Sequence, residues 1–129
     1  MGWILALLAL AAIGIVAWRW RAVLQPPDRA PEHWSESLRP ESGPVVLCLG
    51  DSITHGHLGS DWTEMLAGRG LCVVNGGING DLAWNVVQRL DRALACRPDL
   101  VTILIGANDA MGSFDAGSAR RYVKAKGIP

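Results

Sequence analysis

The longest run of hydrophobic positions lies at the N-terminus. Residues 3–18 contain no charged or strongly polar side chain. As a helix this run would be about 24 Å long, slightly short of a ~30 Å hydrocarbon core. Arg19 and Arg21 follow it and can reach the interface, and tryptophans flank it at both ends. We therefore predict a hydrophobic helix in residues 1–22 that anchors the chain in a membrane.

A cleaved signal peptide and a soluble hydrophobic helix are the alternatives for this segment. No basic region precedes the apolar run, and its Ala9-Leu10-Ala11 stretch, which resembles a cleavage site, lies within the run. Cleavage there would leave a hydrophobic remnant on the mature protein. These features favour an uncleaved anchor. The arginines that follow the run would place the domain in the cytoplasm by the positive-inside rule.

The next segment, residues 23–44, has a different composition. It holds five of the chain's seven prolines together with several acidic side chains. Such a sequence resists both helix and strand and is typical of an extended linker. We predict a proline-rich tether that lifts the following domain, residues 45–129, off a membrane surface.

Within that domain, short apolar runs alternate with helical patterns. Residues 45–49 are a continuous apolar run, as expected for a strand covered on both faces, and the largely apolar residues 71–75 and 100–105 are predicted to form the second and third strands. Between them, a short helix is predicted to end near residue 68, and a longer one over residues 81–95 has apolar positions at intervals of three and four. This order predicts an α/β fold with a parallel sheet and right-handed crossovers.

A polar, glycine-rich loop follows each predicted strand, at residues 50–54, 76–81 and 106–109. Residues 76–80 are predicted to be a loop because glycine at three of five positions is costly in a regular element. In parallel sheets, ligands bind beyond the carboxyl ends of the strands. We therefore expect the three loops to converge on one site.

The side chains in these loops fit acyl transfer. Ser52 is the candidate nucleophile, which needs a nearby base. Its own N–H, the Gly80 N–H and the Asn108 amide could together stabilise the oxyanion that forms during attack. Asp51 is expected to brace its loop, and Asp109 to cap a helix or brace a loop. Taken singly, each residue could equally be an ordinary turn or cap residue.

Charge and cysteine content exclude several other classes of function. Lys and Arg number 12, Asp and Glu number 12, and no basic stripe suggests nucleic-acid binding. The 3 cysteines form no C-x-x-C pair, so we expect neither a zinc nor a redox site and no cofactor. Residues 76–80 do not fit the dinucleotide-binding pattern G-x-G-x-x-G, and no nucleotide-binding P-loop occurs.

These motifs resemble the SGNH/GDSL hydrolase family over about residues 45–110. Gly50-Asp51-Ser52-Ile53-Thr54 is similar to the family's first block, Gly80 to its second, with Gly77 as a possible substitute, and Gly106-Ala107-Asn108-Asp109 to its third. The resemblance implies a three-layer α/β/α, flavodoxin-like parallel sheet, here truncated to about three strands. It also implies that Ser52 is the nucleophile and that Ser52, Gly80 and Asn108 form the oxyanion hole.

The family's late Asp-x-x-His is missing, because the three histidines, His33, His55 and His57, do not follow an aspartate at that spacing. Only His55 lies near Ser52, and the family pattern gives it no role. We therefore expect a partial hydrolase domain with little or no activity of its own.

The resemblance implies a serine esterase or acylhydrolase that cleaves carboxylic esters or thioesters, with a small-molecule or lipid ester as substrate. Analogy with anchored hydrolases favours a domain facing the periplasm or cell exterior. The alternative is an inactive membrane-anchored binding module, or a truncated relic of such an enzyme.

Overall fold

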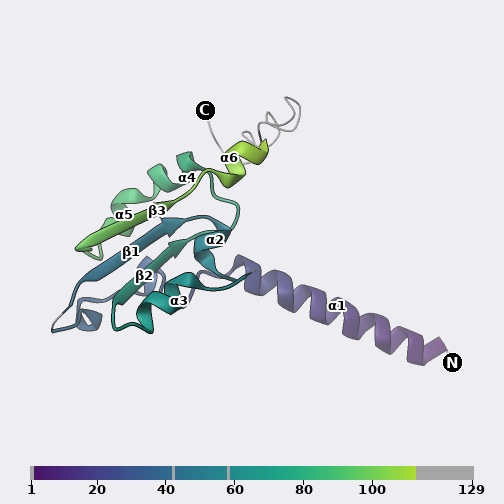
Figure 1. Cartoon of the computed structure of the whole chain (residues 1–129). Helices are drawn as coiled ribbons and strands as arrows, with labels where there is room; N and C mark the ends of the chain where they lie inside the picture. Colours follow the sequence, from purple (N-terminus) through teal and green to yellow (C-terminus); the bar gives the residue numbers. More distant parts are fainter. Residues whose placement is uncertain (1, 42, 58, 113–129) are drawn as a thin grey trace.

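The computed structural model describes residues 2–41, 43–57 and 59–112, so residues 113–129 of the predicted domain lie outside the described part. Within these residues the chain forms a 3-stranded parallel sheet in the order β2-β1-β3 (Figure 1). The strands are β1 (Val45–Gly50), β2 (Cys72–Gly77) and β3 (Leu100–Leu104). The parallel α/β arrangement predicted from the sequence is confirmed.

Helices cover both faces of the sheet, which gives the three layers expected. On one face lie α4 (Ala83–Gln88) and α5 (Leu90–Leu94), and on the other α3 (Trp62–Ala67). The central strand β1 is buried along its whole length. The first face buries Val45, Leu47, Leu49, Val74, Val86, Ala93 and Cys96, and the second buries Val46, Cys48 and Val73.

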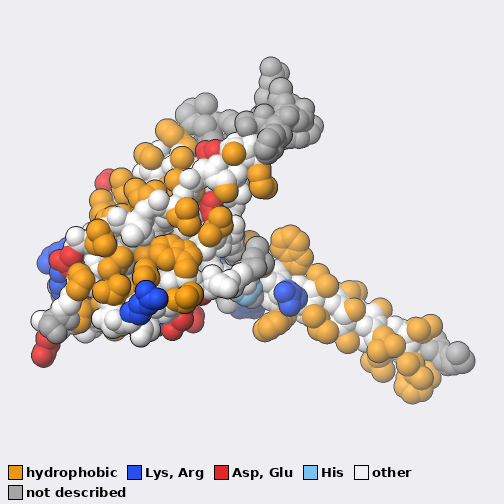
Figure 2. Space-filling view, in the orientation of Figure 1, with side chains coloured by type: hydrophobic (Ala, Val, Ile, Leu, Met, Phe, Trp, Pro, Cys, Tyr) orange, Lys and Arg blue, Asp and Glu red, His pale blue; other side chains and the backbone are white. Residues whose placement is uncertain are grey.

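The apolar N-terminal segment forms the helix α1 (Gly2–Leu24), which leaves the domain beside α2 (Ser52–His55) (Figure 1). Its stretch Trp3–Arg21 has a mean hydropathy of 1.9 and is long and apolar enough to cross a membrane. None of this stretch is buried against the rest of the chain. Figure 2 shows hydrophobic side chains along its length.

The proline-rich segment packs on the domain, which differs from the extended tether that its composition predicts. The Asn75 N–H on the outer edge of β2 donates to the Arg29 carbonyl at 2.8 Å, and Ala30 is buried. Arg39 pairs with Asp99 at 3.2 Å. Two short 3-10 helices, Pro31–His33 and Glu36–Leu38, complete the segment. Composition predicts the lack of long regular elements but not these long-range contacts.

The helix predicted over residues 81–95 is two helices, because the chain departs from helical geometry at Arg89, with φ −111° and ψ 7°. We attribute the break to the Arg89 side chain, whose guanidinium is held by Asp81 and by the carbonyl of Gly50. Amphipathic spacing is continuous across the break and gives no sign of it.

Gly76 and Gly77 belong to β2, so the loop predicted over residues 76–80 is wrong at its first two positions. Close packing explains why glycine is needed in this strand. A Cβ on Gly77 would lie 2.1 Å from the backbone nitrogen of His55, and one on Gly76 would lie 2.9 Å from Leu49 Cδ2. Gly77 therefore lets α2 lie directly against the sheet, and Gly76 leaves room for the Leu49 side chain of β1.

Candidate active site

Ser52 begins α2, immediately beyond the buried strand β1. Asp51 caps this helix, and its Oδ1 accepts from the Ile53 N–H at 3.0 Å. Ser52 itself is half-buried and lines a hollow of about 200 Å³ with Ile53, Gly56, Gly59 and Ser60. The helix cap therefore fixes the backbone at Ser52, and the hollow leaves space beside its side chain.

Gly80 lies in the turn after β2, where its φ of 76° favours glycine over other residues. It is half-buried and lines a different cavity, of about 440 Å³, that reaches the end of α1. Ser52 and Gly80 therefore each border an opening, and the two openings share no lining residue.

Asn108 and Asp109 lie in the first turn of α6 (Ala107–Gly112), which follows β3 after a two-residue connection. The Asn108 Nδ2 donates to the Asp81 carbonyl at 2.9 Å. An amide nitrogen carries two protons, so this bond uses one of them. The Asp109 carboxylate accepts from the Ala83 N–H, with its nearer oxygen at 3.1 Å. Asp109 thus links the third loop to the start of α4.

One network of polar contacts joins the three loops. Arg89 donates from Nε to Asp81 at 2.9 Å and from Nη2 to the Gly50 carbonyl at 3.1 Å. Gly50 precedes the Asp51–Ser52 pair, Asp81 follows Gly80, and Asn108 bonds the Asp81 carbonyl. The side chains of Arg89 and Asp81 are only 18% and 8% exposed, so the pair is shielded from water. The loops that carry Ser52, Gly80 and Asn108 are therefore tied together.

Sequence reasoning missed Arg89 as the residue that connects these loops. A signal was available, because Arg89 lies three positions after Val86 and four before Ala93, both of which are buried. A charged side chain on the buried face of a helix requires a partner. That requirement could have directed attention to Asp81.

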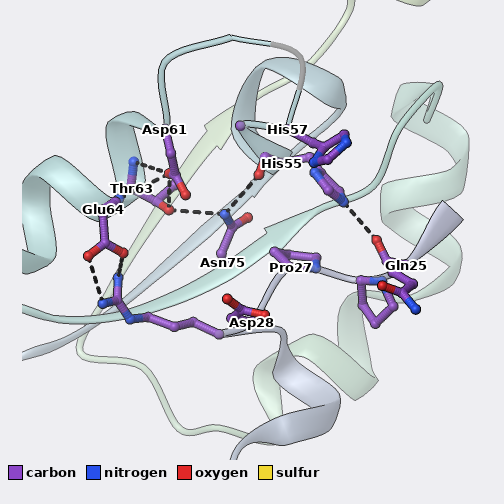
Figure 3. Close-up of a pocket in the computed structure, with 12 residues that line it drawn as sticks. Gln25, Pro27, Asp28, His55, His57, Asp61, Thr63, Glu64 and Asn75 are labelled. Atoms are coloured by element: carbon purple, nitrogen blue, oxygen red, sulfur yellow. Dashed lines mark hydrogen bonds and ion pairs between the residues drawn. The ribbon is translucent and has the colours of Figure 1, made fainter. Parts of the chain in front are cut away.

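Neither ring nitrogen of His55 forms a hydrogen bond with the Ser52 hydroxyl. Its Nε2 lies 2.9 Å from the Gln25 carbonyl, and its buried Nδ1 has no hydrogen-bond partner within the described part of the chain. The ring faces a cavity of about 600 Å³, which Figure 3 shows with His57, Asp61 and Asn75 around it. Ser52, Gly80 and Asn108 do not line that cavity.

Within residues 2–41, 43–57 and 59–112, no group of three or more His, Cys, Asp and Glu side chains is arranged to hold a metal ion. The three cysteines lie outside the candidate site. Burial raises the pKa of the Cys48 and Cys96 thiols above the ordinary value of 9.0.

Comparison with known proteins gives consistent matches. The sequence profile of the GDSL-like lipase/acylhydrolase family matches residues 48–125. An arylesterase from Vibrio mimicus is 34% identical over 88 residues, which make up 60% of this chain and 44% of that protein. The chain therefore spans less than half the length of this relative.

Two solved structures share the fold at 29% sequence identity and a TM-score of 0.52. One is described as a lipolytic protein of the G-D-S-L family from Desulfitobacterium hafniense DCB-2, and the match covers 65% of this chain and 51% of that one. The other is a catalytic mutant of an acetylxylan esterase from Geobacillus stearothermophilus, and the match covers 68% of this chain and 48% of that one.

Proposed function

The chain belongs to the GDSL-like lipase/acylhydrolase family, and on this basis we propose that it carries the nucleophile half of a serine ester hydrolase. The Ser52 Oγ attacks the carbonyl carbon of a carboxylic ester or thioester and gives up its proton, which passes to the alcohol or thiol as that bond breaks. Water then hydrolyses the acyl-Ser52 intermediate, which releases the carboxylic acid and restores the serine hydroxyl. The Ser52 and Gly80 N–H groups and the Asn108 amide stabilise the negative oxygen in each step.

The observation that carries this proposal is the network around Arg89. It connects the carbonyl of Gly50, the Asp81 carboxylate and, through the Asp81 carbonyl, the Asn108 amide. Stabilisation of an oxyanion depends on donors that are held in place before the reaction. The shielded ion pair between Arg89 and Asp81, together with the hydrogen bond from Arg89 to Gly50, supports such a rigid arrangement of the loops. The proposal assigns no general base among the described residues, since the His55 ring is bonded elsewhere.

We further propose that α1 anchors the protein in a membrane, with the domain on the outer side. The length and apolar character of Trp3–Arg21 support a membrane span. Extraction of isolated membranes with alkaline carbonate is expected to leave the protein in the pellet, and N-terminal sequencing to find residue 1 or 2 rather than a cleaved start. Protease treatment of intact cells is expected to degrade the domain, whereas protection would place it in the cytoplasm.

Turnover of a short aryl ester tests the hydrolase proposal. Ser52→Ala is expected to reduce hydrolysis by the protein to the rate of the uncatalysed blank, because the nucleophile is lost. Ser60→Ala is the matched control, since Ser60 lines the same hollow but is exposed and has no proposed role. Because little turnover is expected of this chain by itself, labelling decides the case: a folded parent chain that forms no phosphonate adduct at Ser52 would favour the non-catalytic binding module.

A further inference from the structure

The end of α1 is bonded to the two loops that follow β1 and β2. The Asn79 Nδ2 donates to the Val23 carbonyl at 2.6 Å. The His55 Nε2 lies 2.9 Å from the Gln25 carbonyl and must donate, because a carbonyl oxygen only accepts (Figure 3). Asn79 directly precedes Gly80, and His55 lies on the helix that begins at Ser52. The helix is thus joined to the candidate site itself and not to a remote part of the domain.

The last residues of α1 lie beside a cavity. The helix is exposed along the stretch that could span a membrane, and of its last two residues Val23 is half-buried and Leu24 is exposed. Beyond that point a cavity of about 440 Å³ lies between the helix end and the loop after β2. Its walls include the apolar side chains of Leu24, Pro26 and Ile78 as well as Gly80. This volume falls within the range of roughly 300–1,000 Å³ typical of ligand pockets.

Exposed hydrophobic side chains follow the carboxyl end of each strand. Ile53 after β1 is 51% exposed, Ile78 after β2 is 38% exposed, and Met111 after β3 is 66% exposed. Each lies close in sequence to one of the candidate catalytic residues. Together with the apolar end of α1, they give this edge of the sheet a composition suited to the boundary between headgroups and acyl chains.

From these contacts we propose that α1 holds the active-site edge of the domain against the bilayer, and that the substrate is an ester whose acyl chain lies in the membrane. This inference rests on the proposed hydrolase function and specifies its substrate class. The acyl chain lies along the cavity between the end of α1 and the loop after β2, and Gly80, one of the candidate oxyanion donors, forms part of the cavity wall. A bilayer is favoured over a protein partner because the surface continues directly into a helix able to span a membrane.

Photocrosslinking in phosphatidylcholine vesicles tests the placement of this edge without requiring catalysis. The photoreactive residue benzoylphenylalanine is introduced in place of Ile53, next to Ser52, or in place of Arg69, which is exposed and precedes β2 at the amino end of the sheet. A third position, Trp18 in α1, reports insertion. We expect lipid adducts at positions 18 and 53 and none at 69. Adducts at 18 without any at 53, or equal adducts at 53 and 69, would overturn the proposal.

A variant of the docking contact provides a second test. Asn79→Asp keeps the size of the side chain but replaces the donating amide with a carboxylate, which repels the Val23 carbonyl. It should lower the yield of lipid adduct at position 53 several-fold relative to position 18. Gln88→Glu, the same change at an exposed position on α4, should leave the ratio unchanged. An unchanged ratio in Asn79→Asp would mean that the contact does not orient the edge.

The substrate class is tested with two phosphonates that modify serine nucleophiles. A long-chain phosphonate in the vesicles is expected to modify Ser52 faster than a short water-soluble one, and the reverse order would overturn the inference about substrate. If neither reacts, the hydrolase proposal fails and the substrate inference fails with it. The crosslinking result still decides whether this edge of the sheet faces the membrane.

Discussion

At the scale of single residues, the candidate site depends on Arg89 as much as on the residues of the motifs. Arg89 neutralises Asp81, bonds the carbonyl that precedes the nucleophile loop, and lies in the break between α4 and α5. A buried ion pair of this kind contributes more to the relative placement of its partners than to overall stability. Arg89 is therefore a positioning residue in this account.

Arg89→Met tests that role through stability. The change removes the guanidinium that pairs with Asp81 in a shielded environment, so the free energy of unfolding should fall by about 3–5 kcal/mol. Urea unfolding in detergent, followed by circular dichroism, measures the difference. Arg92→Met is the matched control, because Arg92 is exposed on α5 and should change stability by less than about 0.5 kcal/mol. Equal effects of the two changes would show that the pair does not hold the loops.

The thiols offer a test of burial and of pH dependence. Cys48 and Cys96 are buried, and burial is the main cause of their raised pKa. A thiol reagent at pH 8 should therefore modify half-buried Cys72 first and the other two only on unfolding. Because the folded state keeps these thiol protons to higher pH, their contribution to stability is complete below 9.0 and declines above it. Rapid modification of all three in the folded protein would contradict this packing.

Candidate site residues could be predicted where they belong to a sequence motif. Residues whose role depends on tertiary contacts could not. Ser52, Gly80 and Asn108 were identified from glycine-rich loops after strands, and their catalytic roles stay predictions. Arg89 and Asn79 were not singled out, because their partners lie far away along the chain. The hydrophobic and polar pattern within one element gives no information about hydrogen-bond partners in another element.

At the scale of elements, the contact between α2 and β2 sets the position of the nucleophile. Gly77 lies in β2 directly under the backbone of α2, with no room for a side chain. Composition suggested a loop here because glycine is costly in a strand. The strand forms nonetheless, since six consecutive residues of β2 pair with β1.

Gly77→Ala tests this close packing. The added Cβ would lie 2.1 Å from the His55 nitrogen, so α2 must move away from the sheet. We expect a loss of about 3 kcal/mol or more in the free energy of unfolding, measured by urea denaturation, together with loss of reactivity at Ser52. Gly59→Ala, where a Cβ would meet nothing within 4 Å, should be nearly neutral. A stable and fully reactive Gly77→Ala variant would refute the packing argument.

At the scale of the whole molecule, the sheet has one covered edge and one that no other described segment covers. The outer edge of β2 receives a bond from the proline-rich segment, whereas β3 is exposed along most of its length. Leu100 and Ile103 are 55% and 62% exposed. An unprotected apolar edge strand tends to pair with other chains. The described part of the chain should therefore self-associate through β3.

Ile103→Lys tests this expectation. A charge on the exposed edge strand opposes pairing between chains, so light scattering in detergent should show less self-association with an unchanged circular dichroism spectrum. Val87→Lys, at a similarly exposed apolar position on α4, is the control and should leave self-association as it is. If both changes act alike, general solubility and not the β3 edge is responsible.

The sheet and its layers could be predicted because apolar runs and their alternation with helical patterns are local properties of the sequence. The docking of residues 25–39 and the attachment of α1 to the active-site edge could not, because both depend on long-range hydrogen bonds and ion pairs. From composition alone, the proline-rich segment was predicted to be a tether and the N-terminal helix to be an anchor without contacts to the active-site edge.

The central claim is that Ser52 is a nucleophile held by the surrounding loops. It is tested most directly by treating the folded protein with an alkyl fluorophosphonate and mapping the adduct by mass spectrometry. The account predicts one modified residue, Ser52, and loss of the adduct in Arg89→Met despite the intact serine. Modification of exposed serines at the same rate as Ser52, or no modification of the folded protein at all, would contradict it.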